Sequence, residues 1–223
     1  MSAYIDNYCE RTEPGLWAEP LNALSNLAFL IAAFAAYRLA RRQGGLTFES
    51  GLLIGLLVLI GIGSGLFHLL ATRWSLLADV LPLLLYQVAF IGIYALRVMR
   101  WNWLKAAALV AGFFALTQLF GLLPRHWLNG SLGYAPALLF LLGLGAYHFR
   151  RNFEARSTLL WAAGVFALSL TFRSVDMLVC PVFPAGVHYL WHILNAAVLY
   201  LTLRALLANA SEPGESSRIG LKP

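Results

Sequence analysis

Charged residues are scarce in this sequence. Lys, Arg, Asp and Glu make up 12% of its 223 residues, whereas they make up about 25% of an ordinary soluble domain. Hydrophobic residues make up 60%, against a usual value of about 45–50%. This composition argues against a water-soluble domain. It also excludes a disordered chain, which needs low hydrophobicity and high net charge. We therefore expect an integral membrane protein.

Cysteine is almost absent as well, and the beginning of the chain lacks the pattern of a removable leader. The two cysteines, Cys9 and Cys180, are too few for a disulfide scaffold or for a metal site made of thiolates. Asp6, Glu10 and Glu13 precede the first apolar stretch, which is not typical of a cleavable signal peptide. We therefore expect the first apolar stretch to remain in the mature protein.

Long apolar runs are abundant, and each is close to the roughly 20 residues with which a helix crosses a bilayer. The seven runs are residues 21–37, 51–71, 76–96, 105–123, 131–149, 157–172 and 186–207. They predict an all-α fold, a polytopic seven-transmembrane helix bundle. We expect residues 1–207 to form a single membrane domain that begins with an acidic extracytoplasmic segment, residues 1–20. The polar residues 208–223 are expected to form a disordered cytoplasmic tail.

The basic residues are distributed unevenly between the two sides of this expected bundle. Of the 16 Lys and Arg, 12 follow the first, third, fifth and seventh runs, and 4 lie on the other side. Because cytoplasmic loops carry the excess of Lys and Arg, we expect an extracytoplasmic N-terminus and a cytoplasmic C-terminus. The clustering between apolar runs indicates membrane topology and not nucleic-acid binding. The short loops and the lack of added domains favour a bacterial inner membrane.

This topology places both cysteines on the outer side of the membrane. Cys9 lies in the N-terminal segment, and Cys180 lies before the last run. In an oxidising compartment the two could form a disulfide that ties the segment to the bundle. The alternative is that they are two unrelated small apolar residues.

A few polar side chains lie within the apolar runs, where ionisable groups are costly and usually functional. Ser64 and His68 lie near the end of the second run, and Asp79 lies near the start of the third. His188 and His192 open the seventh run. Because successive runs cross the membrane in opposite directions, all five residues are expected at one depth near the outer surface. Residues four apart lie on the same face of a helix, so Ser64 shares a face with His68, and His188 shares a face with His192.

Three histidines that leave one coordination position open are typical of catalytic zinc. Zinc lowers the pKa of a bound water towards about 7. Asp79 could then transfer protons as general base and acid. Ser64 could donate a hydrogen bond to the oxygen of an attacked carbonyl.

Each of these residues also has a plainer interpretation. A histidine within a span can simply hydrogen-bond to a neighbouring helix, and Ser64 can serve as a small residue that allows close packing. Asp79 can be a negative charge that favours the N-terminus of its helix. The acidic segment before the first run suits calcium, which prefers oxygen ligands, but it could equally be a solvated tail.

Three stretches carry a family likeness. They are Tyr8-Cys9-Glu10 with residues 18–26, residues 63–68 with Asp79, and residues 188–192. These stretches resemble the alkaline ceramidase family, within the wider superfamily of seven-span hydrolases and receptors. The Ser64-x3-His68 pair, the eleven-residue step to Asp79 and the terminal His188-x3-His192 pair all match the family's pattern.

The resemblance implies a zinc ion held by three histidines, with Asp79 as proton carrier and Ser64 assisting. The zinc ligands that it implies are His68, His188 and His192. It also implies cleavage of the amide bond of a ceramide-like lipid to a sphingoid base and a fatty acid. The expected partners are this lipid and the bilayer, and no nucleic acid.

The resemblance further implies a calcium site in the N-terminal segment and a disulfide from that segment to a later loop. The calcium ligands would be Asp6, Tyr8 through its backbone carbonyl, Glu10 and Glu19. The sequence departs from the family pattern at Asn7 and Thr12, where the family has Asp and Asn. The disulfide would join Cys9 to Cys180.

The function that we predict is therefore that of an intramembrane zinc-dependent hydrolase acting on a ceramide-like lipid. One alternative keeps the zinc but changes the substrate to another acyl lipid, because generic Leu, Phe and Val side chains do not distinguish lipid tails. The other alternative is a non-enzymatic seven-span lipid receptor with structural zinc. The sequence does not indicate the oligomeric state.

Overall fold

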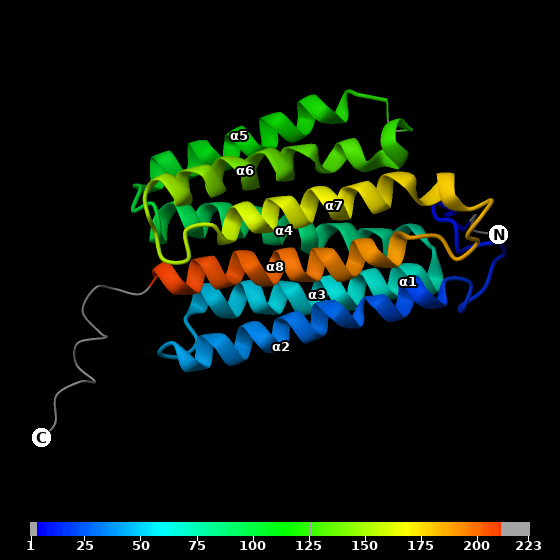
Figure 1. The fold of residues 1–223 in the computed structure, drawn as a ribbon, viewed down its shortest axis with the longest axis horizontal. Helices are drawn as coiled ribbons and strands as arrows, with labels where there is room; N and C mark the ends of the chain where they lie inside the picture. Colours follow the sequence, from blue (N-terminus) through cyan, green and yellow to red (C-terminus); the bar gives the residue numbers. More distant parts are fainter. Residues whose placement is uncertain (1–3, 125, 211–223) are drawn as a thin grey trace, which may run out of the picture.

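A computed structural model describes residues 4–124 and 126–210 of the chain. Its described part consists of helices joined by short connections (Figure 1). The helices are α1 (Pro20–Ser25), α2 (Leu27–Arg42), α3 (Phe48–Leu70), α4 (Arg73–Arg97), α5 (Trp103–Gly121), the 3-10 helix η1 (Trp127–Tyr134), α6 (Ala135–Arg150), α7 (Thr158–Val179) and α8 (His188–Ala210).

Seven helical segments within the described residues are long and apolar enough to cross a membrane. In the first of them α1 continues into α2, and in the fifth η1 continues into α6. This arrangement confirms the predicted all-α, seven-transmembrane fold class. The protein is thus an integral, multi-pass membrane protein.

Several boundaries differ from those predicted, and the first run, expected to end at residue 37, continues to Arg42 in α2. The sixth run was expected to end at residue 172, but α7 continues to Val179. Its last turns carry Arg173 and Asp176, and these polar residues interrupt the apolar run, so the run ends before the helix does. Asp176 is nevertheless fully buried inside the protein. The last helix, α8, runs to Ala210, three residues past the expected domain boundary at 207. The predicted tail from residue 211 onward lies outside the described residues.

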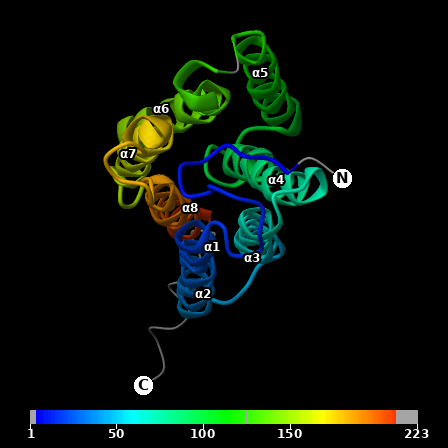
Figure 2. The same ribbon diagram turned by 90° about the vertical axis from the view of Figure 1, so that its right-hand side faces the viewer.

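The spans form a closed ring when viewed along their axes (Figure 2). Around the ring, α2 packs on α3, α3 on α4, α4 on α5, α5 on α6, α6 on α7, α7 on α8, and α8 again on α2. The N-terminal segment crosses over one open end of this ring. Helix α5 is the most peripheral, because only Ala106 and Phe113 of its residues are buried.

Close contact between α3 and α4 fixes the positions of two side chains of interest. The two helices are joined by a tight turn in which Ala71 is left-handed and Thr72 caps α4 through Ser75. Farther up the pair, a Cβ atom at Gly63 would overlap the backbone carbonyl oxygen of Ala78. Only glycine therefore allows the backbones to meet here. The contact lies one residue from Ser64 on α3 and one residue from Asp79 on α4.

The N-terminal segment is fastened across the end of the ring by a disulfide between Cys9 and Cys180. Their Cα atoms are 5.5 Å apart, within the usual range for a disulfide. This bond confirms the predicted pairing. A backbone hydrogen bond from Ile5 to the Ala71 carbonyl, 2.8 Å long, holds the segment to the turn between α3 and α4.

A buried carboxylate joins this segment to the start of α8. Asp176 accepts hydrogen bonds from the backbone N–H groups of Cys9 at 2.9 Å, Val187 at 2.7 Å and His188 at 2.9 Å. A negative charge is favourable at a helix N-terminus because the first N–H groups are unpaired and the helix dipole is positive there. Gly186, with φ of +64°, allows the approach, since a Cβ atom there would collide with the Asp176 carboxylate. Asp176 thus fixes where α8 begins.

Candidate metal centre

Three histidines converge at the end of the ring that the N-terminal segment covers. His68 comes from the last turn of α3, and His188 and His192 come from the first two turns of α8. Each is only 1% exposed, and one nitrogen atom from each lies within 4.8 Å of the others. The Nε2 atoms of His68 and His192 are 3.1 Å apart. The structure therefore brings together the three side chains that the sequence analysis assigned to zinc.

The orientation of His68 is set by Glu19, which immediately precedes α1. Glu19 Oε2 lies 2.5 Å from His68 Nδ1, and Asn22 Nδ2 donates to the same oxygen at 3.0 Å. A carboxylate can only accept a hydrogen bond, so Nδ1 of His68 carries the proton. Its Nε2 atom is then left with a lone pair that faces His192.

The orientation of His192 is set by a second chain of hydrogen bonds. Its Nδ1 atom lies 2.7 Å from the Ser25 hydroxyl oxygen. Ser25 donates its own proton to the backbone carbonyl of Asn22 at 2.9 Å. Since a hydroxyl can donate only one hydrogen bond, Ser25 must accept a hydrogen bond from the protonated Nδ1 of His192. The Nε2 atom of His192 is therefore also free to bind a metal.

His188 is held by stacking. Its ring lies parallel to that of Tyr8, with 3.7 Å between ring centroids. Its buried Nδ1 atom has no hydrogen-bond partner among the described residues. Its backbone N–H is one of those bound by Asp176, so the disulfide-linked segment and the start of α8 position this ring together.

The histidine cluster fits a zinc ion. Imidazole nitrogens lie about 2.0–2.1 Å from zinc, so two of them in a tetrahedral site are about 3.3–3.4 Å apart. The 3.1 Å separation of the His68 and His192 Nε2 atoms is close to this value. An unpartnered buried imidazole nitrogen on His188 and fixed tautomers on the other two rings are also what metal ligands need. Among the described residues, these histidines are the one group of His, Cys, Asp and Glu side chains close enough to hold a metal ion.

Ser64 and Asp79 line a small cavity that His188 and His192 also line. The Ser64 hydroxyl lies beside the Asp79 carboxylate, an arrangement that follows from the contact of α3 and α4 at Gly63. A hydroxyl, a carboxylate and two of the three histidines thus face one space. The chemistry that this arrangement can support is attack of water on a carbonyl group, with proton transfer.

Arg173 is a further polar residue near this cavity. Its guanidinium donates to the backbone carbonyl of Asn129 at 2.6 Å and to the Ser131 hydroxyl at 3.0 Å. It also lies over the rings of Tyr134 and Trp191, 5.1 and 5.7 Å from their centroids. Both rings line the cavity with Ser64 and Asp79. Arg173 therefore holds η1 against α7 and shapes one wall of the site.

The residues assigned to calcium are arranged differently from a cation site. The Glu10 carboxylate accepts the backbone N–H groups of Leu21 at 2.6 Å and Asn22 at 2.8 Å, so it serves the start of α1. Both oxygens of Glu19 are also bound, because Oε1 accepts from Arg11 Nε at 2.5 Å. The Tyr8 carbonyl accepts the Arg11 backbone N–H at 3.3 Å, and Asp6 is exposed. These oxygens face hydrogen-bond donors and do not fit a common calcium ion.

The surroundings of the two glutamates shift their pKa values in opposite directions. Burial raises the pKa of Glu10, and this effect outweighs the hydrogen bonds from Asn22 and Leu21. Burial alone would also raise the pKa of Glu19, but His68, Asn22 and Arg11 together bring it below the ordinary value. Glu19 therefore remains a carboxylate and can accept a hydrogen bond from Nδ1 of His68.

Sequence reasoning missed the residues that orient the ligands. Glu19 and Ser25 both lie in the stretch 18–26 that carries the family likeness, but Glu19 was assigned to calcium and Ser25 was given no role. Their contacts with the histidines depend on how α1 sits on α3 and α8. Tyr8 was assigned to calcium by its backbone, yet its buried ring supports His188. Arg173, in contrast, is expected from the sequence to line the site, because a lone arginine near the end of an apolar span is costly unless it has a role.

Comparisons with known proteins agree with the residues gathered at this site. A comparison of the chain with curated proteins found no match. A family model described as Ceramidase matches residues 3–217, which is nearly the whole chain. Membership of this family supports a ceramide-hydrolysing activity and hence a lipid substrate. The match covers the N-terminal segment, all seven spans and every residue of the histidine cluster, so the chain belongs to the ceramidase family.

Proposed function

We propose that this protein is a zinc-dependent amide hydrolase that cleaves a ceramide-like lipid to a sphingoid base and a fatty acid. The observation that supports it most is the convergence of three buried histidines, two of which line one cavity together with Ser64 and Asp79. A receptor with a structural metal has no need of a hydroxyl and a carboxylate at the same cavity. The assignment to amide cleavage follows from family membership.

His68, His188 and His192 would hold the metal. Bound zinc supplies an activated water and polarises the carbonyl of the lipid amide. The Ser64 hydroxyl would donate a hydrogen bond to the carbonyl oxygen, where negative charge develops during attack. The Asp79 carboxylate would accept a proton from the attacking water and deliver it to the amide nitrogen. Protonation of that nitrogen allows the sphingoid base to leave as a neutral amine.

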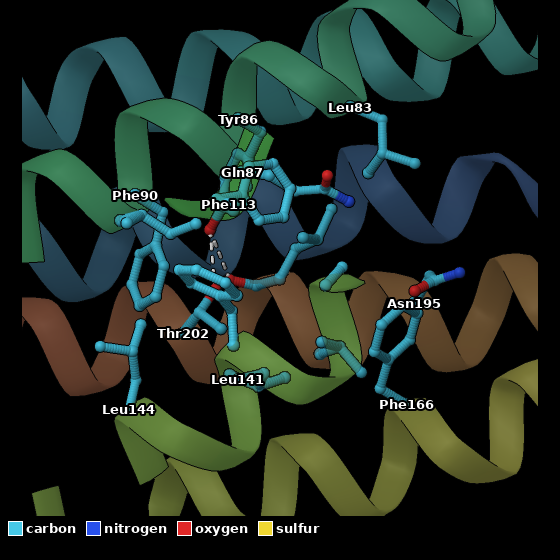
Figure 3. A pocket seen from close by; sticks show the side chains of 15 residues that line it. Leu83, Tyr86, Gln87, Phe90, Phe113, Leu141, Leu144, Phe166, Asn195 and Thr202 are labelled. Atoms are coloured by element: carbon cyan, nitrogen blue, oxygen red, sulfur yellow. Dashed lines mark hydrogen bonds between the residues drawn. The ribbon is translucent and has the colours of Figure 1, made fainter. Parts of the chain in front are cut away.

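An apolar cavity lies in the middle of the ring and is suited to a hydrocarbon chain (Figure 3). Its walls come from α4, α5, α6, α7 and α8, with Phe90, Phe113 and Phe166 among the lining side chains. Leu83 and Asn195 border both this cavity and the one at the histidines. One chain of the lipid would therefore extend from the metal centre into the interior of the bundle.

The polar groups of this cavity are few and lie in two places. Tyr86 donates to the Leu199 carbonyl at 2.9 Å and lies 2.9 Å from the Thr202 hydroxyl, so its own hydroxyl is satisfied within the wall (Figure 3). The side-chain amides of Gln87 and Asn195 lie away from this pair. The remaining lining is apolar, as expected of a site for an acyl or alkyl chain.

Lateral entry suits a substrate that is dissolved in the bilayer. A further cavity is lined by α4, α5, the end of η1 and the start of α6, and it shares Leu83, Gln87 and Phe113 with the interior cavity. We place the metal centre near the extracytoplasmic surface, with the C-terminal end of α8 on the cytoplasmic side. This orientation rests on the excess of Lys and Arg in the loops at that end.

The test combines metal content with turnover in purified protein. We expect close to one zinc per chain by mass spectrometry and release of a fatty acid from ceramide. The double variant His188→Ala, His192→Ala should lose both. His126→Ala is a matched control, because His126 is exposed in an outer connection. Zinc and turnover that persist in the double variant would show that the assigned ligands are wrong.

A further inference from the structure

Arg11 is a buried cation in the N-terminal segment, which covers the end of the ring where the histidines lie (Figure 2). Only 4% of the residue is exposed. Its guanidinium donates from Nε to Glu19 Oε1 at 2.5 Å, from Nη1 to the Gly15 carbonyl at 3.3 Å, and from Nη2 to the His68 carbonyl at 2.8 Å. The side chain therefore links the N-terminal segment to the end of α3.

The position of this charge is favourable for two reasons. Glu19 is a counter-ion of equal burial, with its side chain 2% exposed. The His68 carbonyl belongs to the last turn of α3, where unpaired carbonyls and the helix dipole attract positive charge. A buried charge is tolerated only when it is paired and hydrogen-bonded in this way.

The groups that surround Arg11 are the groups that a hard divalent cation would bind. Calcium is held by carboxylates and backbone carbonyls. Here the Glu19 carboxylate and the carbonyls of Gly15 and His68 all accept from one guanidinium. Because the guanidinium already occupies this position, the oxygen ligands of the segment are satisfied by the chain itself.

The same guanidinium acts on the metal centre through Glu19. While Glu19 Oε1 binds Arg11, Oε2 binds Nδ1 of His68. Without Arg11 the carboxylate would lose one hydrogen bond and its counter-ion. It would then be less firmly placed on His68. An outer partner of this kind typically changes metal affinity by about 10–100-fold.

We propose that Arg11 is the resident cation of the N-terminal segment, that it makes the segment independent of calcium, and that it positions His68 through Glu19. Arg11 is thus a positioning residue and not a metal ligand. The first part concerns the segment alone. The second part rests on the proposed zinc centre.

The first experiment measures calcium binding to the wild-type protein. Protein stripped of all metals is titrated with calcium alone by calorimetry, and its thermal unfolding is followed with and without millimolar calcium. We expect no binding heat and no change in Tm. Saturable binding at micromolar calcium with a rise in Tm would overturn the proposal. Zinc content and ceramide turnover of the untreated protein report separately on the proposed function.

The second experiment measures zinc affinity by competition with a chelator. Arg11→Met should bind zinc about tenfold or more weakly than wild type, and Arg11→Lys should recover part of the loss because it restores a charge. Arg97→Met is the matched control, since Arg97 pairs with Glu49 on the surface at the other end of the bundle. Wild-type affinity in a folded Arg11→Met variant would overturn the positioning role.

A double-mutant comparison separates this role from a merely structural one. If Arg11 acts through Glu19, adding Arg11→Met to Glu19→Gln should lower zinc affinity far less than Arg11→Met does alone. Independent, additive losses would contradict the proposal. If Arg11→Met does not fold, the calcium titration of the wild-type protein still decides the first part, and Arg11→Lys with Glu19→Gln decides the second.

Discussion

The Ser25 hydroxyl lies 2.7 Å from Nδ1 of His192 and donates a hydrogen bond to the Asn22 carbonyl. This relationship joins the short first helix, α1, to the metal centre on α8. It determines which nitrogen of His192 is protonated and leaves Nε2 facing His68. A residue with no part in the chemistry thereby sets the geometry of a ligand.

Ser25→Ala should therefore weaken zinc binding by about tenfold while leaving the fold intact. Chelator competition on the purified variant measures the affinity, and circular dichroism checks the fold. Ser174→Ala is a suitable control, because Ser174 donates only to the Leu170 carbonyl of its own helix. Equal zinc affinities in Ser25→Ala and wild type would exclude the orienting role of Ser25.

Asp79→Asn should retain zinc and lose turnover. The amide that replaces the carboxylate has nearly the same shape but cannot accept and return a proton. General acid–base catalysis contributes about 10²–10⁴-fold, so we expect the kcat for ceramide to fall by at least about 100-fold. The measurement is steady-state release of fatty acid alongside zinc content. Undiminished kcat would mean that another group carries the proton.

Gly63→Ala should destabilise the protein, because the added methyl group would overlap the Ala78 carbonyl and push α3 away from α4. Overpacking of this kind costs about 1–3 kcal/mol. Gly55→Ala on the same helix is the control, since a Cβ atom there meets nothing within 4 Å. Thermal unfolding should show a lower Tm for Gly63→Ala only. Equal Tm values for the two variants would contradict a close contact between Gly63 and the Ala78 carbonyl.

Filling the interior cavity should change which lipids are cleaved. Ala137 borders the interior cavity and the one beside it, so Ala137→Phe should reduce turnover of long-chain ceramides more than that of short-chain ceramides. Leu139→Phe is the control, because Leu139 lies on the same helix but is exposed on the outside of the bundle. A chain-length preference that is the same in both variants and wild type would count against this cavity as the lipid site.

Much of the fold could be predicted because long apolar runs have few other structures available to them. The predicted run at 51–71 corresponds to α3, Phe48–Leu70, and the predicted run at 76–96 corresponds to α4, Arg73–Arg97. Helix α7 is longer than its apolar run, because the buried Asp176 breaks the apolar pattern but forms hydrogen bonds inside the protein. A polar residue in an apolar run suggests that the helix ends there. The helix can continue through it when the polar side chain finds partners inside the protein.

The side chains of the site were predictable to the extent that they are out of place in a span. His68, Asp79 and His188 stand out because an ionisable group in lipid is costly. Glu19 and Ser25 do not stand out, since polar residues are ordinary near the end of a membrane segment. Their contacts with His68 and His192 depend on the break between α1 and α2 and on how α1 lies across α3 and α8. Sequence spacing does not encode that geometry.

The central claim is that one zinc ion is bound jointly by His68, His188 and His192. Anomalous scattering measured at the zinc edge, on crystals of the purified protein, tests it most directly. We expect a single strong peak within bonding distance of one nitrogen atom from each of the three rings, and no peak in crystals of the His188→Ala, His192→Ala variant. Imidazole rings with no anomalous peak between them, in protein that still cleaves ceramide, would contradict the account.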